Sequence, residues 1–209
     1  CDAIRAIILF WLTELLYKKL HLQKIVQFGM KRIFLIGFMG AGKTSVGVCL
    51  SKNMGLTFVD LDHYIESRYL KSVQQLFTEK GEAGFREIEQ KMLREVASFE
   101  DVIISTGGGT PCFFDNMEYM KAHGTTVYLK VSVPELTNRL ELCKGTRPLL
   151  KDKNKEELMD YIRETLLKRK NNYEQADVVF EAEAMETDTD VLSIANALEK
   201  ILYYGSDRR

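Results

Sequence analysis

The chain has 209 residues, a formal net charge of −1 at pH 7 and 45% hydrophobic residues. This length and apolar content suit one α/β domain with a substantial core, and the near-neutral charge gives no overall attraction to nucleic acid or to an anionic membrane. The four cysteines are scattered without a C-x-x-C pair, which argues against a disulfide framework or a zinc site and favours a reducing compartment, so we expect a cytoplasmic protein.

The first 29 residues contain one apolar run, Ala6–Leu12, which ends at Thr13 and Glu14. The run is too short to span a bilayer, and no small-residue cleavage site of a secretory signal follows it. Met30 lies directly before the first predicted strand. We expect residues 1–29 to be an N-terminal extension, which is either a mis-assigned start or a short amphipathic helix that docks on the domain or on a partner.

The first strand is predicted at Ile33–Ile36, and it runs into the sequence GFMGAGKT at Gly37–Thr44. This segment has the G-x-x-x-x-G-K-[ST] spacing of a phosphate-binding loop. The residues after it, Thr44–Met54, carry apolar side chains that suit a helix packed on a sheet. A glycine-rich turn could match the spacing by chance, but a strand before it and a helix after it favour the phosphate-binding loop.

The residues of this loop have the chemistry that binds a nucleoside triphosphate. Backbone N–H groups of a glycine-rich turn and of the following helix N-terminus can surround phosphate oxygens. Lys43 supplies a positive charge to the outer phosphates, and Thr44 offers a hydroxyl to Mg²⁺. We expect a nucleoside triphosphate to be bound by Gly40, Ala41, Gly42, Lys43, Thr44 and Ser45.

The second strand, predicted at Thr57–Val59, leads into Asp60 and Asp62. Alternation along an extended segment would point both carboxylates to the same side of the sheet edge. One carboxylate can then hold the hydration shell of Mg²⁺, and the other can accept a proton from a hydroxyl-bearing substrate. Capping of the helical region that starts at His63 is the alternative role of Asp62. Next to a phosphate-binding loop we favour the chemical role.

A helical region with internal breaks is predicted from His63 to Ser98, and the segment Gly81–Glu89 opens its last helix. Arg86 falls in the first turn of that helix, where the helix dipole disfavours a cation. An anionic ligand or the carboxylate of Glu89, three residues later, could compensate, and the two do not exclude each other.

The rest of the chain continues the alternation of strands and helices. Three glycines, Gly107–Gly109, follow one strand and offer N–H groups and room for a ligand. The alternation predicts a parallel sheet with helices on both faces and functional loops at the carboxyl ends of the strands. The remaining strands are predicted at Val102–Ser105, Thr126–Leu129 and Val178–Phe180, and the helices at Asp115–His123, Pro134–Leu142, Lys155–Tyr173 and Thr189–Leu202.

Six motifs in this order resemble those of the shikimate kinase family over Met30–Leu202. They are G-x-x-G-x-G-K-T, D-x-D, G-F-R-x-x-E, T-G-G-G, R-P-L-L at Arg147–Leu150, and Lys168-Arg169-x-x-x-Tyr173. The resemblance implies a three-layer α/β P-loop NTPase fold with a five-stranded parallel sheet of the nucleoside monophosphate kinase type and a mobile lid. It places the kinase domain at 30–203, the lid at about 143–155 and a polar tail at 204–209, in a protein that is a monomer.

The resemblance also implies a role for each matching residue. Lys43 would contact the transferring phosphoryl group, Thr44 would ligate Mg²⁺, and Asp60 would bind the metal through water. Asp62 would hold the shikimate hydroxyls and act as the base for the 3-hydroxyl. The substrate carboxylate would be held by Arg86 and Arg169 beside Gly107, Gly108 and Gly109, and Arg147 of the lid would reach over the nucleotide phosphates. Tyr173 is expected to pack in the core.

The implied reaction is the Mg²⁺- and ATP-dependent phosphorylation of the 3-hydroxyl of shikimate, which gives shikimate 3-phosphate and ADP in aromatic amino-acid biosynthesis. One alternative is a kinase of the same fold for another small hydroxy acid such as gluconate. The other is a non-catalytic, nucleotide-dependent binding module. Arg139 and Lys144 both lie near the place of the family's basic residue that stacks on adenine, so that role stays open.

Overall fold

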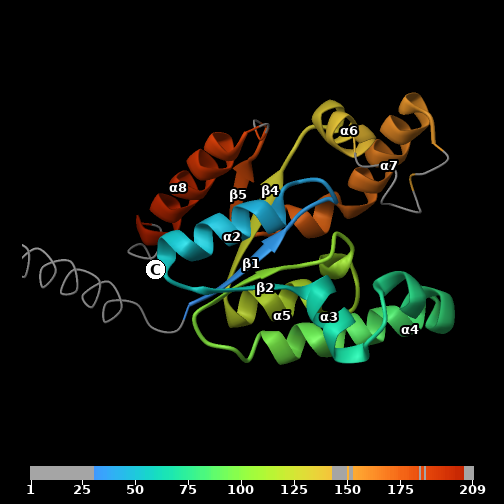
Figure 1. Cartoon of the computed structure of the whole chain (residues 1–209), viewed down its shortest axis with the longest axis horizontal. Coiled ribbons are helices and arrows are strands. Elements are labelled where there is room, and N and C mark those ends of the chain that lie inside the picture. Colours follow the sequence, from blue (N-terminus) through green and yellow to red (C-terminus); the bar gives the residue numbers. More distant parts are fainter. Residues whose placement is uncertain (1–30, 143–149, 151–152, 184, 186, 205–209) are drawn as a thin grey trace, which may run out of the picture. The chain divides into compact units, whose positions relative to one another are not determined.

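A computed structural model describes residues 31–142, 150, 153–183, 185 and 187–204 (Figure 1). The chain divides between Lys31 and Arg32, and the fold described below begins at Arg32. The predicted extension at 1–29, nearly all of the tail at 204–209 and most of the predicted lid, including Arg147, lie outside the described residues.

A five-stranded, fully parallel sheet forms the middle layer, as predicted. Its strand order is β2-β3-β1-β4-β5, so β1, which carries the phosphate-binding sequence, is the central strand. Because the carboxyl ends of parallel strands lie at one edge, the segments that follow β1, β2 and β3 meet there. The strands are β1 (Arg32–Ile36), β2 (Thr57–Asp60), β3 (Val102–Ser105), β4 (Thr125–Lys130) and β5 (Val178–Glu181).

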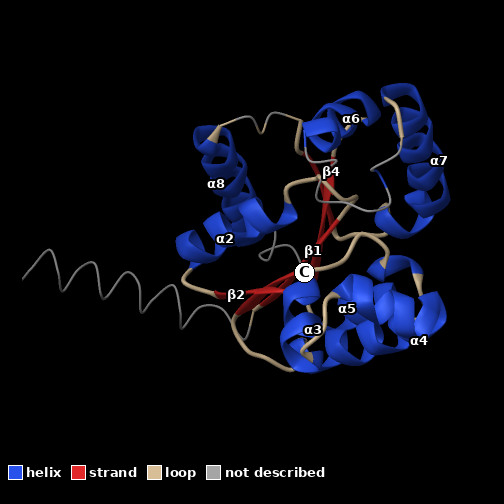
Figure 2. Ribbon diagram, turned by 45° about the vertical axis from the view of Figure 1, so that its right-hand side comes forward, coloured by secondary structure: helices blue, strands red, loops and turns tan. Residues whose placement is uncertain are grey.

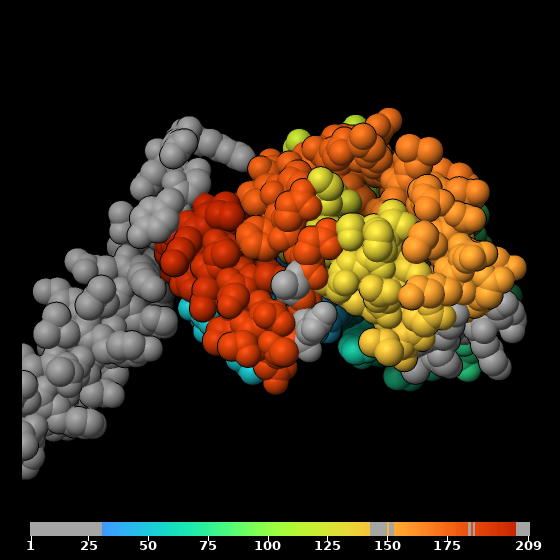
Figure 3. Space-filling view, turned by 90° about the horizontal axis from the view of Figure 1, so that it is seen from above, coloured from blue at the N-terminus to red at the C-terminus, as the bar shows by residue number. Residues whose placement is uncertain are grey.

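Helices cover both faces of the sheet (Figure 2). On one face α2 (Lys43–Met54) packs beside α8 (Asp188–Tyr204), and on the other lie α3 (Leu61–Tyr69), α4 (Val73–Val96) and α5 (Asn116–His123). The remaining helices are α6 (Val133–Leu142), α7 (Lys155–Tyr173) and a short 3₁₀ turn, η1 (Thr110–Cys112). Figure 3 shows α6 in yellow against α7 in orange. None of the helices in the described part of the chain is long and apolar enough to cross a membrane.

The central strand β1 is buried on both faces, which explains its uninterrupted apolar sequence. Ile33 and Leu35 belong to the core beneath α2 and α8, whereas Phe34 and Ile36 belong to the core beneath α3, α4 and α5. All four side chains are buried. The strand is therefore held firmly from both sides, and it presents the following loop at a defined place on the sheet edge.

On the second face, one predicted helix start was wrong, and Arg86 does not lie in the first turn where it was predicted. Helix α3 begins at Leu61, not at His63, and its N-cap is Asp60, whose side chain accepts the backbone N–H groups of Asp62 and His63. Asp62 therefore lies in the first helical turn and is not the cap. In α4 the predicted break falls at Gly81, and Arg86 is the fifth residue after it, just beyond the first turn of the following segment.

Candidate active site

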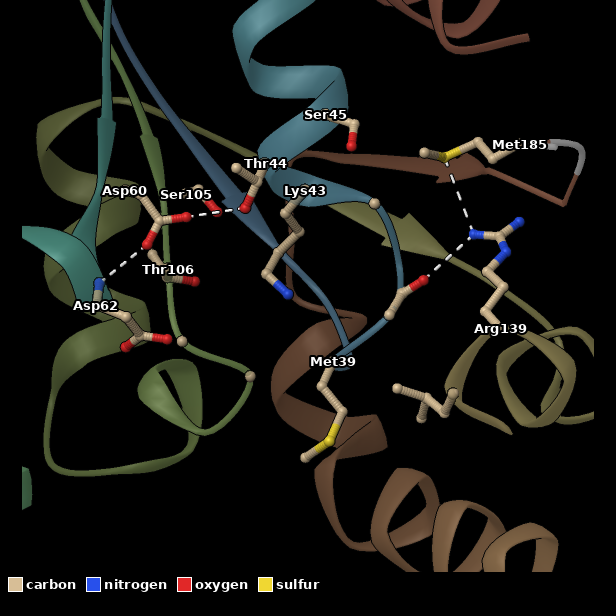
Figure 4. Close-up of a pocket in the computed structure, with 15 residues that line it drawn as sticks. Met39, Lys43, Thr44, Ser45, Asp60, Asp62, Ser105, Thr106, Arg139 and Met185 are labelled. Atoms are coloured by element: carbon tan, nitrogen blue, oxygen red, sulfur yellow. Dashed lines mark hydrogen bonds between the residues drawn. The ribbon is translucent and has the colours of Figure 1, made fainter. Parts of the chain in front are cut away.

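A cavity of about 380 Å³ opens at the carboxyl edge of the sheet (Figure 4). Residues at the carboxyl ends of β2 and β3, and in the segments that directly follow β1, β2 and β3, line it, and residues of α6 and of the loop after β5 complete it. The predicted site residues that line the cavity are Gly40, Gly42, Lys43, Thr44, Ser45, Asp60, Asp62, Gly107 and Gly108. The structure thus brings the phosphate-binding loop and the D-x-D segment to one site.

The phosphate-binding loop needs its glycines for backbone geometry. Gly40 and Gly42 have φ angles of 81° and 84°, in the left-handed region that other residues rarely adopt. At Gly37 a Cβ atom would come within 2.8 Å of the Leu129 carbonyl oxygen. Ala41 is buried and does not line the cavity. The loop therefore supplies backbone groups and the N-terminus of α2 to the cavity, as the sequence predicted.

Lys43 is buried at the start of α2, with 8% of its surface exposed. Its Nζ donates hydrogen bonds of 3.0 Å to the carbonyl oxygens of Gly37 and Phe38. Figure 4 shows the side chain reaching into the cavity along the loop. These bonds hold the ammonium group on the inner side of the loop, where a phosphate group would lie.

Thr44 and Asp60 lie side by side in the cavity wall, where Thr44 Oγ1 donates a hydrogen bond to Asp60 Oδ2 at 2.8 Å. The other carboxylate oxygen of Asp60 accepts the backbone N–H of Asp62 at 3.1 Å. A hydroxyl and a carboxylate are oxygen donors of the kind that Mg²⁺ takes. Within the described ranges no cluster of three or more His, Cys, Asp or Glu could hold a metal alone. Mg²⁺ commonly takes its other ligands from phosphate oxygens and water.

Asp62 lies on the far side of the cavity from the phosphate-binding loop. Burial raises the pKa of its carboxyl group from 3.8 to about 6, and the charges of Asp60 and Glu89 add to this, whereas Lys43 opposes it. A carboxylate with a pKa near neutrality is better suited to accept a proton than an ordinary aspartate. The two predicted carboxylates therefore have different surroundings. Asp60 is hydrogen-bonded to Thr44, whereas Asp62 faces the cavity.

Arg86 is held in place by acidic and aromatic neighbours. It donates to Glu89, which is 1% exposed, at 2.8 Å and to Glu82 at 3.3 Å. Its guanidinium carbon lies 4.1 Å from the centre of the Phe113 ring. A Cβ atom at Gly109 would approach Arg86 Nη2 to 2.7 Å, so a larger residue there would displace the guanidinium group. The ion pair with Glu89 confirms one of the two predicted compensations.

Arg169 reaches the same region from α7. Its Nη1 donates to the carbonyl oxygen of Gly108 at 2.8 Å, and its guanidinium carbon lies 5.6 Å from the ring centre of Phe38. Gly107 lies beside Asp62, because a Cβ atom at Gly107 would be 3.3 Å from Asp62 Oδ1. Arg86, Arg169 and Gly109 do not line the cavity itself but border it through the glycine loop.

Several lining residues were not predicted. Ser105 pairs in register with Asp60 and Leu35. It is the last residue of the predicted strand β3, so the sequence could have placed it at the same edge of the sheet as Asp60. Met185 was not predictable, because it approaches Gly42 from a loop far along the chain. The other lining residues that we did not predict are Met39, Thr106 and Leu140.

Arg139, a candidate for adenine stacking, also lines the cavity. It donates to the carbonyl oxygens of Gly40 at 3.3 Å and of Ala182 at 3.0 Å. Arg139 therefore joins α6 to the phosphate-binding loop and to the loop after β5. The second candidate, Lys144, lies outside the described residues.

Comparisons with known proteins point to one family. A family model described as shikimate kinase matches residues 39–199. The shikimate kinase of Parabacteroides distasonis is 64% identical over 173 residues, which cover 83% of this chain and 100% of the relative. That of Phocaeicola vulgatus is 55% identical and covers 83% of this chain and 99% of the relative.

Solved structures agree with these sequence comparisons. The crystal structure of shikimate kinase from Bacteroides thetaiotaomicron matches with a TM-score of 0.81 and 50% identity, over 84% of this chain and 99% of that chain. Shikimate kinase from Acinetobacter baumannii, in complex with shikimate, matches with a TM-score of 0.76 and 30% identity, over 89% and 99%. The predicted fold class is confirmed.

Proposed function

The chain belongs to the shikimate kinase family and is an enzyme of that activity, and we propose that the cavity of Figure 4 is where it transfers a phosphoryl group from ATP to the 3-hydroxyl of shikimate. One observation carries this proposal. The phosphate-binding Lys43 and the carboxylate of Asp62 line a single cavity, so a phosphate donor and a hydroxyl acceptor can meet there.

On the donor side, the loop after β1 binds the ATP phosphates. Gly40, Gly42 and the N-terminus of α2 present backbone N–H groups to anionic oxygens. Lys43 places a positive charge where negative charge spreads over the transferring group. Little covalent help is needed for phosphoryl transfer, so this positioning and charge supply most of the rate.

Thr44 and Asp60 are the residues that would hold Mg²⁺. The hydroxyl and carboxylate oxygens, 2.8 Å apart, fit a metal that keeps several waters and takes its other ligands from phosphates. When bound, Mg²⁺ neutralises charge on the phosphate oxygens. Asp60 is fixed for this role because its second oxygen caps α3.

On the acceptor side, Asp62 orients the hydroxyl and accepts its proton. It lies in the first turn of α3, an element fixed in the core by Leu61 and Ile65. Its raised pKa brings the carboxylate close to the working pH, where it is still mostly ionised and able to take a proton.

The acceptor's carboxylate would be held by Arg86 and Arg169, at the border of the cavity formed by Gly107–Gly109. Forked guanidinium groups bind carboxylates through two parallel hydrogen bonds, so they fix the direction of a small anionic ring as well as its place. Arg147, in the predicted lid, would close over the nucleotide and exclude water, which could otherwise accept the phosphoryl group.

The two alternative functions lose support from the comparisons. Curated relatives at 50–64% identity carry the name shikimate kinase, which favours neither a gluconate kinase nor a non-catalytic binding module. The direct test is ADP release with ATP and Mg²⁺ in the presence of shikimate, of gluconate or of no acceptor. We expect stimulation by shikimate alone. Stimulation by gluconate to the same extent, or by neither acceptor, would overturn the proposal.

We also propose that the enzyme is a cytoplasmic monomer that binds neither nucleic acid nor membranes. Scattered cysteines without close pairs and a net charge of −1 support this. Light scattering at increasing protein concentration tests the oligomeric state, and a mass that rises toward that of a dimer would contradict it.

A further inference from the structure

Tyr173, the last residue of α7, buries a phenol hydroxyl at the border of the active site. The residue is 0% exposed, and its ring centre lies 4.9 Å from that of Tyr128. Burial of a hydroxyl is unfavourable unless it is hydrogen-bonded, and a phenylalanine would fill the same space without that cost. Simple core packing, the role expected from the sequence, therefore does not explain the hydroxyl.

The hydroxyl takes part in a three-membered network with Arg169 and Gly108. It donates to the carbonyl oxygen of Gly108, which also accepts Arg169 Nη1 at 2.8 Å. Arg169 Nη1 lies 3.4 Å from the tyrosine oxygen as well, one helical turn away. Burial raises the pKa of Tyr173, so the hydroxyl keeps its proton and remains a donor.

This network joins α7 to the glycine loop with little freedom. A Cβ atom at Gly108 would lie 3.2 Å from Arg169 Nη1 and 3.3 Å from the backbone nitrogen of Met39. One edge of the guanidinium is thus occupied by the loop. Within the described part of the chain, Nε and Nη2 of Arg169 make no such hydrogen bond, which leaves them for a carboxylate.

We propose that Tyr173 is a positioning residue for the acceptor: its hydroxyl holds Arg169 and the Gly108 carbonyl in one arrangement, so that the guanidinium is oriented before shikimate binds. The inference rests on the proposed function, in which Arg169 binds the substrate carboxylate. Tyr173 itself does not line the cavity and acts through Arg169.

The test is the steady-state kinetics of Tyr173→Phe, with Tyr128→Phe as the matched control. Both variants remove one phenol hydroxyl from the same pair of neighbouring rings, but only the Tyr173 hydroxyl donates to Gly108. For Tyr173→Phe we expect the KM for shikimate to rise about three- to tenfold, the effect of one neutral hydrogen bond. The kcat and the KM for ATP should stay within twofold, and all three constants should stay unchanged in Tyr128→Phe.

A second readout separates positioning from a merely structural role. Shikimate methyl ester lacks the carboxylate charge, so its inhibition constant should differ less than twofold between the wild type and Tyr173→Phe. An equal rise for shikimate and its ester would show a general loss of structure and would overturn the inference. So would an unchanged KM for shikimate in Tyr173→Phe.

Arg169→Lys distinguishes failure of the inference from failure of the proposed site. If Arg169→Lys raises the KM for shikimate tenfold or more and Tyr173→Phe does not, Arg169 binds the substrate without help from Tyr173. If Arg169→Lys leaves the KM unchanged, Arg169 does not hold the carboxylate, and both the site assignment and the inference fall.

Discussion

At the scale of single residues, Asp62 shows that a side chain suited to the reaction can weaken the fold. Burial and nearby carboxylates raise its pKa from 3.8 to about 6. The folded protein therefore holds this proton more tightly than the unfolded chain. The contribution of Asp62 to the free energy of unfolding consequently falls as the pH rises from about 4 to 6. Above pH 6 the ionised group carries the whole penalty, about 2–3 kcal/mol.

Asp62→Asn should therefore stabilise the ligand-free protein in a pH-dependent way. Without ATP and Mg²⁺, we expect the variant and the wild type to unfold with equal free energy near pH 4. The variant should be more stable by about 2–3 kcal/mol at pH 7. Urea denaturation at several pH values measures this difference. A difference that is the same at every pH would show that the charge of Asp62 is not its cause.

Arg86 supports a second prediction, because Arg86→Lys keeps a positive charge beside Glu89 but loses the forked donors. We expect kcat/KM for shikimate to fall about 10- to 100-fold, since charge-assisted hydrogen bonds contribute about 1.5–3 kcal/mol each. The KM for ATP should not change. Arg94→Lys is the control, because Arg94 lies on the same helix and pairs with the exposed Asp115. Equal kinetics for the two variants would exclude Arg86 from substrate binding.

The sequence predicted many of the residues that line the cavity, but for some of them it predicted the wrong local structure. Asp60 and Asp62 were expected to share a direction along a strand, yet Asp60 caps α3 and Asp62 lies in its first turn. The D-x-D motif identifies the residue types at these positions. That α3 begins at Leu61, two residues before the predicted start, depends on how Leu61 packs in the core. Arg139 and Met185 meet the phosphate-binding loop only through tertiary contacts, which leave no local pattern.

At the scale of elements, the kink in α4 sets the direction of the segment that carries Arg86. Gly81 has φ 68° and ψ −179° within a run that is otherwise helical. This region of backbone conformation is almost restricted to glycine. An added Cβ atom would meet nothing within 4 Å, so any cost of a larger residue comes from the backbone alone.

Gly81→Ala should consequently destabilise the protein by about 1–3 kcal/mol. An ordinary glycine within a helix would give the opposite sign, because alanine is favoured there by about 1 kcal/mol. Ala83→Gly, at an exposed position of the same helix, is the control and should cost about 1 kcal/mol. Thermal unfolding of both variants measures these changes in stability. A Gly81→Ala variant as stable as the wild type would mean that α4 can form without the kink at Gly81, and would contradict the prediction.

Element types were predicted more securely than element ends. All five strands were found within about two residues, because a parallel sheet buries apolar runs such as Ile33–Ile36 on both faces. Helices α7 and α8 were also found, because each is a long helical stretch that begins after a polar segment. The region from His63 to Ser98 was resolved less well, because its breaks depend on a cap at Ser72 and on the backbone of Gly81.

At the scale of the whole molecule, the sheet order explains why motifs distant in sequence act together. Strand β1 lies between β3 and β4, and β2 lies beyond β3, so the segments that follow β1, β2 and β3 share one edge. In the proposed site, the phosphate donor binds at the loop after the central strand, and the acceptor binds between α3, α4 and the glycine loop. The predicted family membership is confirmed, whereas the lid and the N-terminal extension stay predictions.

Single-turnover phosphoryl transfer in Asp62→Asn tests most directly whether this one cavity joins donor and acceptor. With saturating ATP, Mg²⁺ and shikimate, the wild type should form shikimate 3-phosphate, identified by ³¹P NMR. Asp62→Asn should bind ATP with an affinity within twofold of the wild type and transfer the phosphoryl group about 10²- to 10⁴-fold more slowly, the usual range for loss of a general base. Transfer at the wild-type rate, or to another hydroxyl, would contradict the assignment of Asp62 and of the cavity.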